Sequence, residues 1–254
     1  MNILVVRPRG FYLETLARLK KVLGGNKYNI VDREDLLGSH YNNIELVIVV
    51  GGDGTFLRAG HFNDKIPMFG INPAPGEKEG FFMQADKNDF EEKIKKVLGG
   101  KYRLSKLQRL SVLINGKEIE ELALNEVYIG DAKPYTMFNY FMKVGKDTEY
   151  HRSSGVLIGT ASGSHAWLKS AEGKVMKKEE RGMQYASREL YKGRLTPGYR
   201  LKSGILAEGE KIEIIPDMPA IVVADSVGRE YAVKRKDRII VTTSKHDLNL
   251  IELL

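Results

Sequence analysis

The sequence contains no cysteine, which excludes disulfide bonds, thiolate nucleophiles and cysteine-ligated zinc. No apolar run approaches the ~20 residues that a membrane-spanning helix needs, and the first residues, MNILVV, predict a strand rather than a secretory signal. We therefore expect a cytoplasmic protein without a membrane partner. With 254 residues, 42% of them hydrophobic, the chain is long enough to bury a core in one large domain or two modest ones.

Acidic residues are the minority among the charged ones: 33 Asp and Glu stand against 40 Lys and Arg, a formal net charge of +7. The basic residues are scattered, and no basic helix with interleaved aromatic residues is visible. This pattern disfavours nucleic-acid binding. A site for two polyanionic nucleotides would account for the surplus, and so would a solvated surface, so the charge alone does not decide.

The most informative segment is residues 46–59, LVIVVGGDGTFLRA. Its leading apolar run predicts a strand buried on both faces, and Thr55 opens a segment with helical character. Glycines at a strand-to-helix turn let backbone N–H groups approach a phosphate closely. The turn lacks the Gly-Lys-Ser/Thr ending of a P-loop and the G-x-G-x-x-G spacing of a dinucleotide fingerprint. Asp53 is placed to work on a substrate group beside bound phosphates; the alternative is a surface turn in which Asp53 only caps a helix.

Strands and helices alternate along the first hundred residues, which predicts a parallel, Rossmann-like sheet with helices on its faces. We expect helices at Phe11–Leu23 and Asp86–Leu98, each ended by a Gly-Gly pair. The irregular stretch Asn72–Gly80 is predicted to be either a mobile lid or a passive surface loop. The expected strands are Asn2–Val6, Tyr28–Val31, Leu46–Val50 and Met68–Ile71.

Past Gly100 the pattern changes to short strands joined by turns, with helices expected only at Gly163–Glu172 and Glu179–Tyr191. We therefore expect two domains. The first is an α/β domain at 1–99, and the second is a β-rich, β-sandwich-like domain at 100–254, with the extreme C-terminus expected to pack back on the first domain. The strands expected in the second domain are Arg103–Ile114, Glu118–Ile129, Met137–Val144, Gly155–Thr160, Lys211–Ile215, Ala220–Ala224 and Arg238–Thr243.

Four motifs resemble those of the NAD kinase family. The Gly-Gly-Asp-Gly-Thr run at 51–55 is shared by NAD kinases, 6-phosphofructokinases and the diacylglycerol and sphingosine kinases. Three later segments favour NAD kinases among these. Asn72 followed by Gly-Phe-Phe at 80–82 resembles the family's Asn-x-Gly-x-x-Gly-Phe-Leu stretch, and Leu-Asn-Glu-Val at 124–127 resembles its Asn-Glu motif. Residues 154–167 resemble its Asp-Gly … Thr-Pro-Thr-Gly-Ser-Thr-Ala-Tyr segment.

These motifs follow the family order, and the resemblance covers residues 1–170 well and the remainder poorly. Some positions depart from the family pattern. Ser154 stands where most members have aspartate, Ala161 replaces proline, and His165 and Trp167 replace threonine and tyrosine. Ser154 and Trp167 make the chain similar to a divergent branch of the family that includes the mitochondrial NAD kinases.

The resemblance implies an NAD kinase-like fold and transfer of a phosphoryl group from ATP or polyphosphate to the 2′-hydroxyl of the adenosine ribose of NAD, giving NADP. Asp53 would be the catalytic base. Mg²⁺, or another divalent metal, would be carried by the donor phosphates, without a metal site made by protein side chains alone. A homodimer or homotetramer is implied as well. The donor phosphates would bind Gly51, Gly52, Gly54, Thr55 and Arg58, and NAD would bind Asn72, Phe81, Phe82, Asn125, Glu126, Arg152, Thr160, Ser162, His165, Ala166, Trp167 and Ser170.

Several of these residues have a structural alternative. Adjacent aromatic residues such as Phe81 and Phe82 usually place one ring in the core, Trp167 could itself be a core residue, and a lone histidine such as His165 is more often structural than catalytic. Two other functions stay open. One is a lipid or small-alcohol kinase that shares the glycine turn. The other is a catalytically silent NAD-binding regulator, against which the presence of Asp53 argues.

Overall fold

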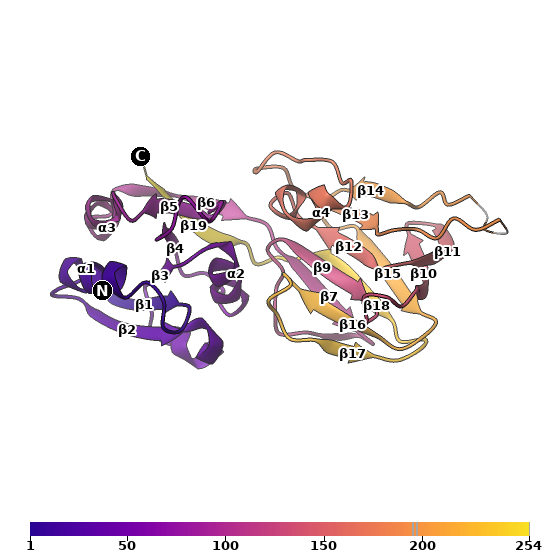
Figure 1. Ribbon diagram of the computed structural model, residues 1–254, viewed down its shortest axis with the longest axis horizontal. Helices are drawn as coiled ribbons and strands as arrows, with labels where there is room; N and C mark the ends of the chain where they lie inside the picture. Colours follow the sequence, from indigo (N-terminus) through magenta and orange to yellow (C-terminus); the bar gives the residue numbers. More distant parts are fainter. Residues whose placement is uncertain (195, 197, 254) are drawn as a thin grey trace. The chain divides into compact units, whose positions relative to one another are not determined.

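Two compact units make up the chain, one formed by residues 1–107 and 246–254 and the other by residues 108–245 (Figure 1). The computed structural model describes residues 1–194, 196 and 198–253.

The first unit is longer than the expected 1–99, because strand β6 (Tyr102–Leu107) belongs to its sheet. The last strand, β19 (Leu248–Leu253), pairs in parallel with β4 (Met68–Asn72) and in antiparallel fashion with β6. The C-terminal segment is therefore part of the first unit, which is built from two separate segments of the chain.

A seven-stranded sheet forms the middle of the first unit, with the strand order β2-β1-β3-β4-β19-β6 and with β5 paired to β4 as well. All of these pairs are parallel except β19 with β6, so the predicted α/β domain with a Rossmann-like sheet is confirmed and has one antiparallel edge. The strand order reverses between β1 and β3, which is where open α/β sheets bind ligands. The other strands of this sheet are β1 (Asn2–Arg7), β2 (Lys27–Asp32), β3 (Leu46–Val50) and β5 (Met83–Asp86).

Helices cover both faces of this sheet. The apolar stripes of α1 (Leu13–Val22) and α3 (Phe90–Leu98) share one core with alternate residues of the strands. α2 (Asp53–His61) lies on the other face (Figure 1). With helices on both sides, every residue of β3 is buried, as its apolar run predicts. Two short 3₁₀ helices, η1 (Arg33–Asp35) and η2 (Gly38–Tyr41), follow β2. No helix in the part of the chain that the structure describes is both long and apolar enough to cross a membrane.

Two six-stranded antiparallel sheets form the second unit and share one core between them, which confirms the predicted β-sandwich-like domain. The order of the first sheet is β11-β10-β15-β18-β7-β8, and that of the second is β14-β13-β12-β9-β16-β17. The first sheet comprises β7 (Leu110–Ile114), β8 (Lys117–Glu118), β10 (Phe138–Val144), β11 (Asp147–Ser153), β15 (Lys211–Pro216) and β18 (Ile239–Thr243). The second comprises β9 (Glu126–Gly130), β12 (Val156–Gly159), β13 (Met183–Ser187), β14 (Ser203–Leu206), β16 (Ala220–Ala224) and β17 (Tyr231–Val233).

The predicted helix at Glu179–Tyr191 is wrong. This stretch contains β13, which pairs with β12 on one side and β14 on the other. Met183 and Tyr185 alternate into the core, and this cross-strand pairing outweighs the helical preference of the charged residues around it. The helix predicted at Gly163–Glu172 is reduced to a 3₁₀ turn, η3 (Gly163–His165), and a single turn of α-helix, α4 (Trp167–Ser170).

Candidate functional site

The glycine turn of the first unit joins β3 to α2 at the carboxyl edge of the sheet. The N–H of Gly51 donates to the carbonyl of Ile71 at 3.0 Å, which ties the turn to β4. A Cβ on Gly51 would lie 2.7 Å from the hydroxyl oxygen of Thr55, so only glycine fits there. α2 begins at Asp53, and the first N–H groups of a helix have no partner within the helix. The turn can therefore present backbone donors to an anion such as a phosphate.

Asp53 does not cap its own helix. One of its carboxylate oxygens accepts the N–H of Phe81 at 3.1 Å, and the other accepts the N–H of Phe82 at 3.0 Å. These two bonds fix the half-buried carboxylate in one orientation. A carboxylate oxygen has more than one acceptor position, so both can still accept a further proton donor, such as a substrate hydroxyl.

Asn72 orders the loop that follows β4. Its amide oxygen accepts the N–H of Ala74 at 3.0 Å, and its amide nitrogen donates to the carbonyl of Lys78 at 3.0 Å. Asn72 is itself buried. The contribution of this residue to the site is therefore to hold the loop, and the loop leads directly to the two N–H groups that orient Asp53.

Phe82 and Arg58 lie differently from the prediction. The Phe82 ring is 1% exposed and stacks on Phe56 with ring centres 5.0 Å apart, so it belongs to the core and only its backbone reaches the site. Phe81 is half-buried and meets Phe82 edge to face, which leaves its ring as the candidate for ligand contact. Arg58 is five residues after Asp53 along the helix, about 140° around the axis. Its guanidinium lies 4.8 Å from the centre of the Phe62 ring, so the structure does not bring it to the turn.

In the second unit, a buried carboxylate organises the Asn-Glu motif. Asp225, directly after β16, accepts the backbone N–H groups of Leu124, Asn125 and Glu126 at 2.8, 2.6 and 3.2 Å. Asp225 adopts a left-handed backbone conformation, with φ of +55°. These bonds fix the entry to β9. Val127 and Ile129 then point into the core, while Glu126 and Tyr128 point to the opposite face of the sheet, beside α4.

Asn125 and Glu126, which are adjacent in the sequence, each carry a buried acceptor. The amide oxygen Oδ1 of Asn125 and the carboxylate oxygen Oε2 of Glu126 are buried and have no hydrogen-bond partner among the described residues. Burial, with a smaller contribution from the negative charge of Asp225, raises the pKa of Glu126 to about 8, while the backbone N–H of Trp167 opposes the rise. Buried acceptors of this kind are costly without a donor. The pair is therefore suited to a ligand that brings hydroxyl donors.

The segment after β12 packs tightly on this motif. The N–H of Thr160 donates to the carbonyl of Asn125 at 2.9 Å, and its hydroxyl donates to the carbonyl of Leu124 at 2.6 Å. The same hydroxyl accepts the N–H of Gly163 at 3.2 Å. A Cβ on Gly163 would overlap the carbonyl oxygen of Asn125, so the close approach requires glycine. The hydroxyl of Thr160 is therefore used in hydrogen bonds to the backbone. Ser162, which was also predicted to bind NAD, is buried.

Trp167 is neither a core residue nor an exposed one. Its half-buried ring stacks on Tyr128 at 5.5 Å, and the guanidinium of Arg188 lies 4.7 Å from its centre. Ala166 before it is half-buried as well. His165 is exposed, and its Nε2 pairs with the carbonyl of Met176 at 3.0 Å, which is a structural contact.

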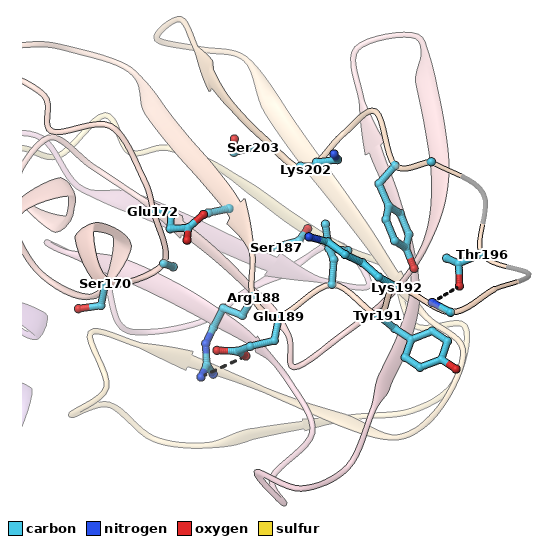
Figure 2. A pocket seen from close by; sticks show the side chains of 16 residues that line it. Ser170, Glu172, Ser187, Arg188, Glu189, Tyr191, Lys192, Thr196, Lys202 and Ser203 are labelled. Atoms are coloured by element: carbon cyan, nitrogen blue, oxygen red, sulfur yellow. Dashed lines mark hydrogen bonds and ion pairs between the residues drawn. The ribbon is translucent and has the colours of Figure 1, made fainter.

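Ser170 and Arg152 are lining residues of two different cavities. Ser170 lies on the wall of a cavity of about 660 Å³ that Arg188 also borders (Figure 2). Arg152 lines a cavity of about 560 Å³ and places its guanidinium 4.6 Å from the centre of the Tyr191 ring. The structure therefore gathers Asn125, Glu126 and the 160–167 segment into one cluster, and Arg152 lines a cavity that shares Tyr191 with the cavity of Ser170.

Known proteins are similar to this chain in sequence. The family model described as the ATP-NAD kinase N-terminal domain matches residues 9–102. A probable NADH kinase of Oryza sativa subsp. japonica is 30% identical to this chain over 226 residues, which cover 80% of this chain and 69% of the rice protein. The chain belongs to the NAD kinase family.

Other members of the NAD kinase family also match this chain. The NAD kinase of Methanosarcina barkeri is 37% identical over 135 residues, 52% of this chain and 47% of that protein, so the match spans about half of that relative. Among solved structures, an NAD kinase from Archaeoglobus fulgidus in complex with ATP has a TM-score of 0.80 at 23% identity, over 98% of this chain and 93% of that one. Yeast NADH kinase complexed with NADH has a TM-score of 0.82 at 13% identity. That match covers 100% of this chain and 84% of the yeast chain. At these identities the two structures establish the NAD kinase fold.

Asp225 is absent from the residues predicted for an NAD kinase site, although its carboxylate holds the whole Asn-Glu motif. The available signal was an acidic residue at the end of an apolar strand, in the run Val-Val-Ala-Asp-Ser. Ser154, which stands where most family members have aspartate, donates its N–H to the carbonyl of Arg188 at 3.0 Å and accepts the hydroxyl of Tyr128 at 3.2 Å through its own carbonyl. Its backbone thus supports the ring that stacks on Trp167.

Proposed function

We propose that this protein is an NAD kinase, which transfers a phosphoryl group from ATP to the 2′-hydroxyl of the adenosine ribose of NAD and so makes NADP. Membership of the NAD kinase family supports this proposal. The observation that carries it is the pair of buried acceptors on Asn125 and Glu126, which has no donor among the described residues. A ribose diol supplies two hydroxyl donors, one for each of these acceptors, whereas diacylglycerol has a single hydroxyl.

The first unit would remove the proton of the acceptor hydroxyl and position the donor phosphates. Asp53 would accept the proton of the 2′-hydroxyl as the new oxygen–phosphorus bond forms and the bond from the γ-phosphorus to the donor's bridging oxygen breaks. General-base help of this kind is worth about 10²–10⁴-fold in rate. The two backbone bonds to Asp53 support this role, because a fixed carboxylate needs no reorientation in the transition state. The glycine turn would hold the phosphates through backbone N–H groups.

Mg²⁺ is part of this proposal. Among the described residues, no cluster of three or more His, Asp or Glu side chains is arranged to hold a metal ion. Mg²⁺ usually keeps several waters and binds through one or two carboxylates and the substrate phosphates, so the residues present fit an ion that arrives with the donor, with Asp53 as the carboxylate at the turn. When bound, the ion would offset the charge that develops on the donor oxygens.

Incubation of the protein with NAD, ATP and MgCl₂, followed by chromatographic detection of NADP, tests the proposal directly. We expect NADP from the wild type and a turnover reduced by roughly 10²-fold or more in Asp53→Asn, with NAD binding within a few-fold of normal. Near-normal turnover of Asp53→Asn would remove Asp53 from the chemistry. Phosphorylation of diacylglycerol or sphingosine without NADP formation would favour the lipid kinase alternative, and NAD binding without any product would favour a silent regulator.

Three finer features belong to the same proposal: use of polyphosphate as an alternative donor, assembly as a homodimer or homotetramer, and a cytoplasmic location. Replacing ATP with polyphosphate in the NADP assay tests the first. Light scattering coupled to size-exclusion chromatography tests the second, and a monomeric mass at micromolar concentration would contradict it. Fractionation of the source cells tests the third.

A further inference from the structure

The glycine turn lacks the lysine that follows the glycines of a P-loop, and the structure supplies one from another segment. A Cβ on Gly52 would lie 2.9 Å from Cδ of Lys78 and 3.7 Å from its Cγ. The methylene chain of Lys78 therefore lies directly on the α-carbon of Gly52. Gly52 has no side chain, and this absence makes room for the lysine.

The position of Lys78 is built into the loop after β4. Its carbonyl accepts the amide of the buried Asn72 at 3.0 Å, and its N–H donates to the carbonyl of Ala74 at 3.1 Å. Two residues later, Gly80 has φ of +69°, and a Cβ there would lie 2.7 Å from the Asn72 amide nitrogen. The backbone on both sides of Lys78 is thus fixed by a core residue, although its side chain is exposed. No carboxylate of the described residues lies within ion-pair distance of the Lys78 ammonium.

A second cation reaches the turn from the other direction. Arg33, in η1 after β2, donates from Nη1 to the hydroxyl of Thr55 at 3.4 Å, while its Nε donates to Glu34 at 2.9 Å. In the sheet, β2 and β4 lie on opposite sides of β1 and β3. Arg33 and Lys78 therefore approach Gly-Gly-Asp-Gly-Thr from its two sides.

We infer that Lys78 and Arg33 bind the phosphate chain of the donor from the two sides of the glycine turn. This inference rests on the proposed function, because it assigns the turn to the donor. A lysine ammonium acts as a point charge for phosphate oxygens, and a guanidinium offers a planar set of donors. Backbone N–H groups at the turn orient the phosphates through directional hydrogen bonds. The two side chains supply the positive charge that offsets the charge of a triphosphate.

Binding of ATP and of inorganic tripolyphosphate, measured by calorimetry without NAD, tests the inference on the full chain. Lys78→Met keeps the methylene chain over Gly52 and removes the charge, and Arg33→Met does the same beside Thr55. We expect each to weaken binding of both probes by about 10-fold or more, the loss of a hydrogen bond to a charged group. NAD affinity should stay within two-fold. Lys78→Arg should bind ATP nearly as well as the wild type.

Lys101→Met is the matched control, because it removes one exposed positive charge directly before β6, the edge strand that β19 separates from β4. It should bind both probes like the wild type. Wild-type affinity for ATP and tripolyphosphate in Lys78→Met and Arg33→Met would overturn the inference. An equal loss in Lys101→Met would also overturn it, since it would reduce the effect to net charge. Loss of ATP binding with retained tripolyphosphate binding would place the two residues at the nucleoside instead. A wild type that binds ATP but makes no NADP would refute the proposed function and leave the binding result standing.

Discussion

Replacing Glu126 with glutamine should remove a pH dependence from the stability of the second unit. The pKa of the Glu126 carboxyl is raised from 4.5 to about 8 in the folded protein. Between these two values the folded state holds a proton that the unfolded state has released, so stability falls as the pH rises and the loss is complete above pH 8. Each pKa unit corresponds to about 1.4 kcal/mol. The full loss is therefore roughly 4–5 kcal/mol, of which roughly 2–3 kcal/mol falls between pH 6 and pH 9.

The measurement can be confined to the unit that holds Glu126. Trp167 is the only tryptophan of the chain and lies beside Glu126, so its fluorescence reports the unfolding of this unit in urea. The difference in free energy of unfolding between Glu126→Gln and the wild type should grow by roughly 2–3 kcal/mol from pH 6 to pH 9 in favour of the glutamine variant. Glu172→Gln, which changes an exposed carboxylate of the same unit, should run parallel to the wild type. Parallel curves for Glu126→Gln as well would refute the reasoning.

Ligand binding extends this prediction. A ribose hydroxyl that donates to Glu126 Oε2 favours the charged carboxylate, because a hydrogen bond to the charged form stabilises it. NAD binding below pH 8 should therefore release a proton, and the calorimetric enthalpy should change with the ionisation enthalpy of the buffer. Glu126→Gln should bind NAD more weakly and without this buffer dependence. The same buffer dependence in both proteins would assign the proton to another group.

Two further predictions concern the segment that packs on the Asn-Glu motif. NAD added without a donor should change the fluorescence of Trp167 in a saturable way, and Trp167→Ala should weaken NAD binding by about 1–3 kcal/mol while Trp167→Tyr largely restores it; fluorescence indifferent to NAD would remove this ring from the pocket. Gly163→Ala should displace the segment from the Asn125 carbonyl and destabilise the second unit by about 1–3 kcal/mol in urea denaturation, whereas Gly76→Ala, where a Cβ meets nothing within 4 Å, should unfold like the wild type.

The parts of the fold that follow from local patterns could be predicted from the sequence. The apolar run of β3 specifies a buried strand, and the glycines after it specify a turn. Both depend only on residues that are neighbours in the sequence. The strand β13 could not be predicted from its neighbours in the sequence. Its charged neighbours favour a helix, and only the strands on either side, which are distant in sequence, make Met183–Ser187 a strand.

The candidate site shows the same division. Asp53 and the Asn125–Glu126 pair stand in motifs and could be named from the sequence. Asp225 could not, because its role depends on three N–H groups about one hundred residues earlier in the chain. Arg58 was expected at the donor phosphates from the family resemblance, yet its guanidinium lies against the Phe62 ring. A motif gives the position of a residue in the sequence and leaves the direction of its side chain open.

The strand that lies between β4 and β6 in the first unit follows the whole second unit along the chain. Residues 108–245 form a continuous stretch that precedes β19 in the chain, so the sandwich can fold while β6 still lacks the strand with which all six of its residues pair. An open strand edge is a place where another chain can pair. Nascent chains stalled or cleaved before Leu248 should therefore carry a finished second unit and an aggregation-prone first one.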